Sequence, residues 1–469
     1  MAEARAFWAP QAWVDGRWQA QVLLECGAGG DWERITPGVA SAPPGATVLA
    51  GPALPGLVDA HSHAFQRAFA GLAERREQDS DDFWSWRDRM YGVALRITPA
   101  QLQAVAAQLY VELLQGGYTQ VCEFHYLQHD VDGQPYGDPA TLAWSLCDAA
   151  EATGIGLTVL PVLFERAGFD RAPLRHDQRR FRTTPAEVQA LYRSIAAARR
   201  PRVNAGIAIH SLRGASPEAI ADLLRRVGDA DLPVHIHVAE QTAEVDACLA
   251  ETGQRPIEHL CHGASGQPVP DTRWQLVHAT HATPAEIDAV ALAGAGIVLC
   301  PSTEANLGDG VPDLPRWLAA DVPISLGSDS QVTRSWPEEL RWLEYAQRLT
   351  RRVRNVGAAP ERGQASTAAR LFDAVLAGGG RAAGHTLWGF TADARADLLV
   401  LDANAPGMLG VPASSRLDAL VFATDAPALC EVYVAGECLV RNGRHVGQAQ
   451  IGAQFAQAMD SLWGDGGRG

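Results

Sequence analysis

The sequence predicts an α/β protein: a (β/α)8 TIM barrel joined to a small β-sandwich that is discontinuous in the chain. Three observations favour this fold class. Strand-like apolar runs alternate with helical segments through the middle of the 469-residue chain. Hairpin-like segments occur near both ends, and histidine or acidic residues follow several central strands, where barrels of this kind place their functional groups.

Both ends of the chain are typical of antiparallel β-structure. Two apolar runs flank Asp15 and Gly16, a pair that favours a tight hairpin turn. Residues 397–402 have the pattern of a strand, and residues 431–443 have that of a second hairpin. We therefore expect residues 1–55 and 385–469 to form one β-sandwich, and residues 56–384 to form the barrel.

The central region supplies enough strands to close a barrel. Four apolar runs are strand candidates, at residues 120–124, 156–163, 203–209 and 296–300, and helical patterns cover residues 100–115 and 217–227. Four further strands end in the polar residues considered below. Residues 66–98 form a long excursion that contains Phe83, Trp84 and Trp86. It either caps the barrel mouth or packs on the barrel side, and we favour capping.

The first barrel strand carries a candidate metal-binding pair. Leu57, Val58 and Ala60 make a short apolar run, and His61 and His63 follow two residues apart. Because strand side chains alternate, both imidazoles point the same way and could share a metal ion. Two half-exposed loop histidines would give the same short pattern, so the pair alone leaves both interpretations open.

Further candidate ligands recur at the ends of other apolar runs. One run ends in His237 and Glu240, the next in His278, and a later one in Asp329. The order His-x-His, His-x-x-Glu, His and Asp, spread over about 270 residues, resembles the amidohydrolase superfamily and its mononuclear deaminase branch. The barrel expected here is therefore of the amidohydrolase type, which a discontinuous β-sandwich flanks.

Longer stretches resemble one family within that branch. Residues 61–68, 123–126, 210–213, 235–241 and 300–310 are similar to the formimidoylglutamate deiminases of histidine degradation, and this resemblance covers essentially the whole chain. It implies hydrolysis of the terminal C=N bond of N-formimidoyl-L-glutamate to N-formyl-L-glutamate and ammonia. Cleavage of the other C–N bond would release formamide and glutamate, and the residues alone do not decide between the two.

The ligand set that we infer is His61, His63, His237 and Asp329, holding one divalent metal. Zinc is the default for an imidazole-rich site, and iron would also bind. A divalent ion lowers the pKa of a bound water from about 15.7 to about 7. His235 shares a side of its strand with His237 and is the competing ligand. We prefer His237 because it leaves the His-x-x-Glu spacing.

The resemblance also implies roles for the remaining groups. Asp329 would accept the proton of the attacking water, Glu240 would carry protons to the substrate nitrogen, and His278 would orient the attacking group and stabilise the tetrahedral intermediate. His281 follows three residues after His278, past the strand end, and we expect it to be structural.

The implied substrate is a small anion with two carboxylates. Arg87 and Arg213 suit carboxylate binding because a guanidinium donates two parallel hydrogen bonds. Either arginine could instead be a solvated surface charge. Gln66, Tyr126 and His210 match further substrate contacts of the family.

Two other functions remain open. A deaminase of guanine or a related purine would share the metal ligands but would need stacking aromatics and amide groups where this chain offers arginines. A catalytically silent barrel serving as a scaffold belongs to another class of protein. Such relatives lose ligands, whereas all four inferred positions are filled here.

Composition bounds the partners. A formal net charge of −15 argues against nucleic acid. No apolar stretch has the roughly 18–20 residues of a membrane span. Eight scattered cysteines form no Cys-x-x-Cys pair, so we expect no disulfide framework. All 39 basic residues are arginines, which excludes a carbamylated lysine bridging two metals. We expect a cytoplasmic enzyme that forms a homodimer.

Overall fold

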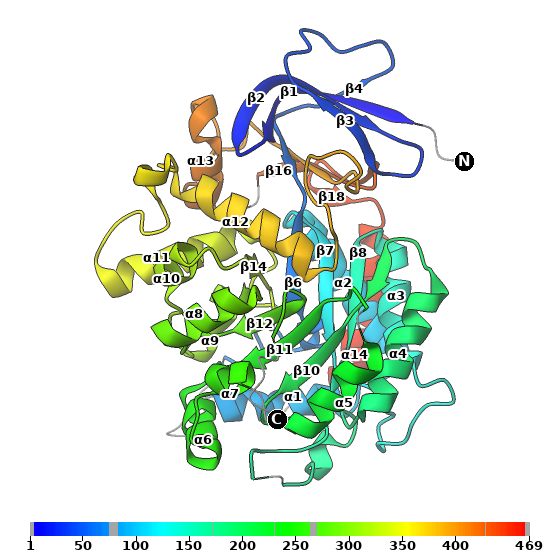
Figure 1. The fold of residues 1–469 in the computed structure, drawn as a ribbon. Helices are drawn as coiled ribbons and strands as arrows, with labels where there is room; N and C mark the ends of the chain where they lie inside the picture. The colour runs from blue at the N-terminus through cyan, green and yellow to red at the C-terminus, as the bar shows by residue number, and fades with distance from the viewer. Residues whose placement is uncertain are drawn as a thin grey trace.

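The computed structural model describes residues 4–74, 83–170, 172–228, 230–262, 270–426 and 428–464. Its strands form two sheets (Figure 1). One sheet is a closed parallel barrel surrounded by helices, and the other forms a separate sheet domain, drawn at the top of Figure 1. The predicted fold class is confirmed.

Eight strands close the barrel, because the last of them pairs back to the first. In spatial order they are β6 (Leu57–Ser62), β7 (Tyr118–His125), β8 (Gly156–Leu163), β10 (Ile207–Ser211), β11 (Val234–Val238), β12 (Trp274–His278), β13 (Gly296–Leu299) and β14 (Ile324–Leu326). A short segment, β9 (Val203–Ala205), pairs with β8 in the register that β10 continues. The strand expected at residues 203–209 is thus two segments interrupted at Gly206.

Helices alternate with the strands along the chain, and most of them cover the outside of the barrel. They are α1 (Phe83–Ala94), α2 (Pro99–Gln115), α3 (Thr141–Thr153), α4 (Pro185–Ala198), α5 (Pro217–Val227), α6 (Thr242–Thr252), α7 (Pro256–His262), α8 (Pro284–Ala293), α9 (Pro301–Leu307), α10 (Leu314–Ala319), α11 (Trp336–Arg351) and α12 (Thr367–Ala382). Short 3-10 turns are η1 (Ala64–Ala68), η2 (His176–Gln178), η3 (Pro360–Arg362) and η4 (Ala413–Ser415).

Three of these helices begin with the same local sequence. Thr98, Thr184 and Thr283 are each followed by Pro-Ala and then by Gln or Glu, and each forms a capping box in which threonine and the third helical residue satisfy each other's backbone N–H. Proline at the first helical position lacks an N–H that would have no partner there. The sequence therefore sets the start of α2, α4 and α8 locally.

The second sheet takes strands from both ends of the chain. Its path runs β18 (Arg444–His445), β17 (Glu437–Arg441), β16 (Leu429–Val434), β15 (Leu398–Leu401), β5 (Ala53–Pro55), β1 (Arg5–Val14), β2 (Arg17–Cys26) and β3 (Trp32–Thr36), with β4 (Thr47–Val48) beside β1. The expected hairpin around Asp15 and Gly16 is present. Both residues have positive φ, as a two-residue turn of this kind requires.

Two elements of the C-terminal region pack on the barrel helices. The helix α13 (Arg416–Phe422) contacts α11 and α12, and α14 (Gln448–Trp463) packs along α2. At the other junction, β5 leads through Gly56 directly into β6. The boundaries 1–55, 56–384 and 385–469 stay a prediction.

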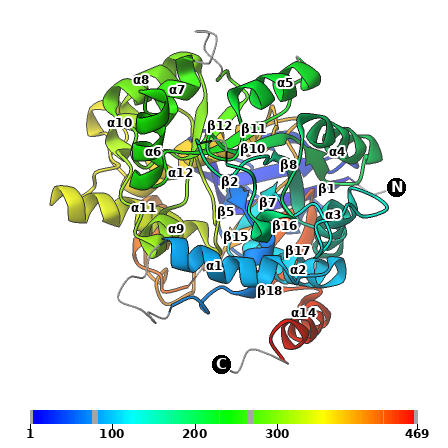
Figure 2. The same cartoon turned by 90° about the horizontal axis from the view of Figure 1, so that it is seen from below.

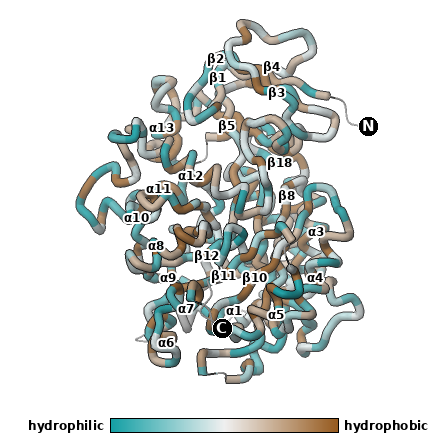
Figure 3. Tube along the Cα trace, viewed as in Figure 1, coloured by the Kyte–Doolittle hydropathy of each residue, from teal (hydrophilic) through white to brown (hydrophobic). Residues whose placement is uncertain are grey.

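Buried apolar side chains form two core clusters, whereas many of the projecting loops are hydrophilic (Figure 3). All eight cysteines are free thiols, and six are buried. Within the described ranges, no helix combines the length and the hydrophobicity needed to cross a membrane.

Candidate active site

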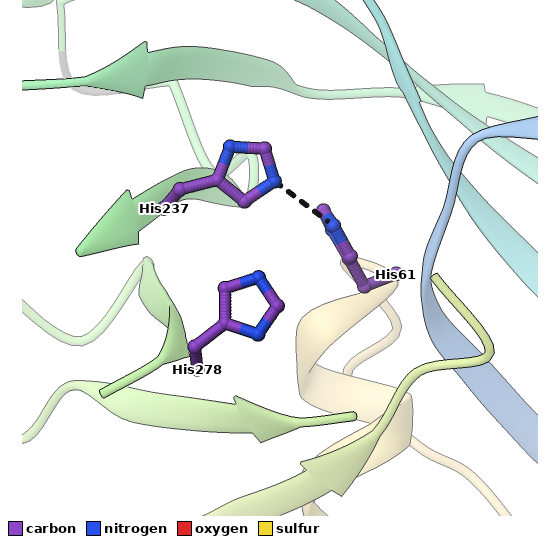
Figure 4. Close-up of side chains that lie close together, drawn as sticks. All are labelled: His61, His237 and His278. Atoms are coloured by element: carbon purple, nitrogen blue, oxygen red, sulfur yellow. Dashed lines mark hydrogen bonds between the residues drawn. The ribbon is translucent and has the colours of Figure 1, made fainter. Parts of the chain in front are cut away.

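Three histidines and an aspartate converge at the carboxyl ends of β6, β11 and β14. His237 Nε2 lies 3.0 Å from His61 Nε2, and Figure 4 shows these two rings pointing toward each other with His278 beside them. Asp329 Oδ1 lies 3.4 Å from Nε2 of His61 and 3.4 Å from Nε2 of His63. The structure thus brings together all four predicted metal ligands.

The donor atoms fit a metal ion. Zinc bonds of about 2.0–2.2 Å in a tetrahedral arrangement would place ligand atoms about 3.3–3.6 Å apart, close to the separations observed. His63 Nδ1 contacts the Phe124 carbonyl at 3.0 Å, and His237 Nδ1 contacts the His210 carbonyl at 2.9 Å. Since a carbonyl only accepts, each Nδ1 carries the hydrogen, which leaves the Nε2 lone pair for a metal.

Burial sets the charge of these side chains. It lowers the pKa of His61 to about 3, and it also lowers the pKa of His63 and His237. The imidazoles are therefore neutral at pH 7, the form that binds metals. Burial alone would raise the pKa of Asp329, but its contacts with His61, His278 and His63 hold that pKa below the usual range. Its carboxylate is ionised.

The competing ligand His235 and the neighbouring His281 lie elsewhere. His235 is buried, and its Nε2 donates to the Ala382 carbonyl at 2.8 Å, at the end of α12. His281 lies beside Gly310, and its backbone N–H donates to Ala239. Neither belongs to a group of possible ligands found among the described residues.

His278 stands among three carboxylates. Its Nε2 is 3.7 Å from Glu240 Oε1 and 3.9 Å from Asp329 Oδ2, and its Nδ1 is 3.6 Å from Glu304 Oε1. Burial opposes charging of the ring, but Glu240 and the other two carboxylates raise the pKa of His278 to about 10. Burial raises the pKa of Glu240, against the opposing effects of His278 and Arg213. The pair can therefore hold a proton beside the candidate metal ligands.

A pocket opens from this group toward solvent, and all five predicted substrate contacts line it: Gln66, Arg87, Tyr126, His210 and Arg213. Gln66 donates to the Tyr126 hydroxyl at 3.1 Å, and Arg213 Nη2 lies 3.9 Å from Glu240 Oε2. His210 stacks on Phe164 with ring centroids 4.1 Å apart, and burial lowers its pKa well below the usual value.

One wall of the pocket comes from the excursion after β6. Trp86, Arg87, Met90 and Tyr91 of α1 line the pocket, and Figure 2 shows α1 along one side of the barrel, between α9 and α2. This part of the excursion therefore lies beside the site and forms one wall of the pocket. The side chains of Phe83 and Trp84 lie outside the described residues.

A match that spans most of the chain decides the family. The sequence model described as "Amidohydrolase family" matches residues 53–439. The chain belongs to the amidohydrolase family.

Individual relatives agree with this assignment. A curated relative from Pseudomonas aeruginosa, a formimidoylglutamate deiminase, is 44% identical over 458 residues, covering 97% of this chain and 99% of that protein. The crystal structure of an amidohydrolase from Brucella melitensis matches with a TM-score of 0.91 at 40% identity, covering 98% and 99% of the two chains. A 5-methylthioadenosine/S-adenosylhomocysteine deaminase from Natronomonas pharaonis is 28% identical over 356 residues, 75% of this chain and 73% of its own.

Amidohydrolases are metal-dependent hydrolases, and this amidohydrolase has several groups of side chains that could hold an ion. The described groups are His61, His63 and Asp329; His61, His237 and His278; and His278, Cys300 and Asp329.

Sequence reasoning missed several supporting residues of this amidohydrolase. Glu123 on β7 accepts hydrogen bonds from the Ser62 hydroxyl at 2.7 Å and from the Ala64 N–H at 3.0 Å, on either side of His63. Glu304 faces His278 from the first turn of α9. Both lie in stretches that resemble the family, at residues 123–126 and 300–310, and this resemblance is the signal that could have found them.

The backbone is left-handed at two candidate site residues of this amidohydrolase. His278 has φ 69° and Asp329 has φ 49°, a conformation that costs non-glycine residues about 1–3 kcal/mol and clusters at functional sites. Asp329 is held there because its N–H donates to the His61 carbonyl at 2.9 Å and its carbonyl accepts from the His63 N–H at 3.3 Å. The two strand ends are thereby locked together.

Proposed function

We propose that this amidohydrolase hydrolyses N-formimidoyl-L-glutamate to N-formyl-L-glutamate and ammonia. The observation that carries the proposal is that three guanidinium groups, of Arg87, Arg166 and Arg213, line the pocket that ends at the candidate metal ligands. In a chain of net charge −15, such a local concentration of cations favours an anionic substrate. The 44% identical relative, a formimidoylglutamate deiminase, supports the same substrate.

One divalent metal, with zinc as the first choice and iron second, would be held by His61, His63, His237 and Asp329. When bound, it supplies Lewis-acid chemistry that makes water nucleophilic at neutral pH. The neutral imidazoles and the ionised carboxylate described above suit this donor set.

The surrounding residues would handle the protons. Asp329 Oδ2 faces His278 Nε2 and can accept the proton of the attacking water. Glu240, whose pKa is raised by burial, can then pass a proton to the departing nitrogen. His278, charged between its carboxylates, can donate to the oxygen that gains negative charge.

The rest of the pocket would hold the glutamate part of the substrate. Arg87 and Arg213 would bind the two carboxylates bidentately, while Gln66, Tyr126 and His210 would bind the polar groups between them. We take ammonia, rather than formamide, as the product because the 44% identical relative is a formimidoylglutamate deiminase.

A purine deaminase fits the pocket less well, although the relative from Natronomonas pharaonis is named a 5-methylthioadenosine/S-adenosylhomocysteine deaminase. The pocket does contain aromatic side chains, but the three guanidinium groups in its lining favour an anion over a neutral heterocycle. We further propose that the enzyme acts in the cytoplasm as a homodimer. Light scattering on the purified protein measures the oligomeric state.

The test is a substrate panel. Arg213→Met should lower kcat/KM for formimidoylglutamate by about 10- to 100-fold, since one charge-assisted pair contributes about 1.5–3 kcal/mol, while metal content stays unchanged. Formiminoglycine, which lacks the side-chain carboxylate, should be a poor substrate of the unmodified enzyme. Equal turnover of formiminoglycine and formimidoylglutamate, or efficient guanine deamination, would contradict the assignment.

A further inference from the structure

Arg213 sits at the tip of a tight turn after β10. The Gly214 N–H donates to the Ser211 carbonyl at 3.0 Å, so residues 211–214 form a β-turn with Leu212 and Arg213 as its central residues. The peptide between those two residues is the one whose flip converts one common turn type into another. Its orientation therefore fixes the direction in which the Arg213 side chain leaves the backbone.

The segment after β8 holds this turn at several points. The N–H groups of Glu165 and Arg166 donate to the Gly214 carbonyl at 2.8 Å and 3.2 Å. The Glu165 carboxylate accepts from the Ser216 N–H at 2.8 Å. Phe164 stacks on His210 as described above, so three consecutive residues each contact the loop that carries two proposed substrate contacts.

Arg166 makes the contact that bears on the central peptide. Its Nη2 donates to the Leu212 carbonyl at 2.7 Å, and this carbonyl belongs to the peptide that precedes Arg213. A flip of the peptide would break that hydrogen bond and would force a positive φ on Arg213, which the present turn does not have. The guanidinium of Arg166 thus holds the turn in one of its two forms, from a position in the pocket wall beside Arg213.

We propose that Arg166 is a positioning residue for substrate specificity: it acts through the Leu212 carbonyl to keep Arg213 directed at a carboxylate of the substrate. The proposal deepens the proposed function and rests on it. Because Arg166 acts on the binding geometry through the Leu212 carbonyl, its loss should appear in KM more than in kcat.

The experiment is a double-mutant cycle with Arg166→Met and Arg213→Met, assayed by ammonia release from formimidoylglutamate. Arg166→Met should raise KM about tenfold and change kcat by less than about threefold, with metal content unchanged. Added to Arg213→Met, it should raise KM by less than about twofold more, because its target is already absent. Arg166→Lys keeps a cation and a donor and should recover most of the loss.

Arg341→Met is the matched control. Arg341 also donates to a backbone carbonyl, that of Val421, with an Nε···O distance of 2.6 Å, but it does not line the pocket. It should leave KM unchanged. Effects of Arg166→Met and Arg213→Met that multiply, or a KM change in Arg341→Met as large as that in Arg166→Met, would overturn the proposal. If Arg166→Met does not fold, the same cycle with Arg166→Gln decides it.

Binding of glutarate, a five-carbon dicarboxylate, separates this proposal from the proposed function. Calorimetry on the same variants should show about tenfold weaker binding in each single variant and no further loss in the double variant. That pattern would support Arg166 even if the unmodified protein released no ammonia from formimidoylglutamate, whereas equal glutarate affinity in all variants would overturn the positioning role.

Discussion

Asp329 meets two demands with one residue type. Its carboxylate faces His61 and His63, and its backbone adopts the left-handed conformation that joins the ends of β6 and β14. Aspartate is among the few non-glycine residues that tolerate this conformation. A glutamate would keep the charge, but its carboxylate would stand one methylene further from the backbone, and glutamate tolerates the left-handed conformation less well than aspartate. The choice of aspartate thus follows from geometry as well as from chemistry.

Glu240→Gln tests the proton-transfer role at the scale of one side chain. The amide keeps the shape and cannot exchange a proton with the substrate nitrogen, so turnover should fall by about 100-fold or more while metal content is retained. Steady-state ammonia release and elemental analysis measure the two quantities.

Glu286→Gln is the matched control for that variant. Glu286 is equally buried but pairs with Arg255 at 2.9 Å and caps α8, so its replacement should affect stability rather than turnover. Turnover of Glu240→Gln within a few-fold of the unmodified enzyme would show that another group carries the proton.

Prediction from sequence worked for residues whose role follows from their place on one strand. His61, His63, His237, His278 and Asp329 were placed correctly at strand ends because β-structure alternates locally. Arg166 and Glu304 escaped notice because their partners lie 46 residues away at Leu212 and 26 residues back at His278. Only the closed barrel brings such pairs together.

At the scale of elements, the barrel closes between β14 and β6 through few backbone contacts. One residue pair, Leu326 with Asp59, registers the two strands, and a bridge between Ser62 and Asp329 follows. An ion triad reinforces the same join from outside. Glu112 on α2 binds Arg67 from η1 at 2.8 Å and Arg334 from the loop after β14 at 3.1 Å.

Glu112→Gln should weaken this join. Burial acts to raise the pKa of Glu112, but Arg67 and Arg334 outweigh it and hold the pKa below the usual range. A carboxylate whose pKa is lower in the folded protein than in the unfolded chain, where it is about 4.3, stabilises the fold at any pH above that unfolded value. This stabilisation is lost as the pH falls through the lower pKa of the folded state. The variant should lose about 1–3 kcal/mol at pH 7 and less below about pH 4.

Denaturant unfolding of both proteins across this pH range measures the difference. Glu25→Gln removes an exposed ion pair with Arg34 in the second sheet and should change stability little at any pH. A stability loss in Glu112→Gln that grows on acidification would contradict the role given to the triad.

Helices were predictable to within a residue where local signals define them. The pattern over residues 100–115 corresponds to α2, and that over residues 217–227 to α5. The packing of α14 on α2 could not be predicted. The pattern of an amphipathic helix indicates that the helix has an apolar face, but it does not indicate which surface covers that face.

At the scale of the whole molecule, the candidate metal ligands join strands that lie far apart in the barrel. Nε2 of His61 on β6 and Nε2 of His237 on β11 lie 3.0 Å apart. Two such nitrogens repel each other unless a cation or a proton lies between them. Metal removal by a chelator should therefore lower Tm by an amount on the order of 5 °C, by the loss of binding free energy from the folded state alone.

Elemental analysis and thermal unfolding before and after chelation test this prediction. The protein should contain one divalent metal per chain, and His61→Ala should lose it and show no response to the chelator. His281→Ala, outside the proposed ligand set, should keep the metal and the response. Two tightly bound metals per chain, or full metal content in His61→Ala, would contradict the proposed centre.

The pairing of β5 with β15 also orders events during synthesis. β5, which leads directly into the strand carrying His61, has β15 as its neighbour on one side, about 340 residues further along the chain. At ribosomal rates of about 5–20 residues per second, β5 waits roughly 20–70 s for that neighbour. Throughout this interval the nascent sheet presents an unpaired strand edge, the kind of surface that attracts other chains. We therefore expect this edge to need cover in the cell until β15 has been made.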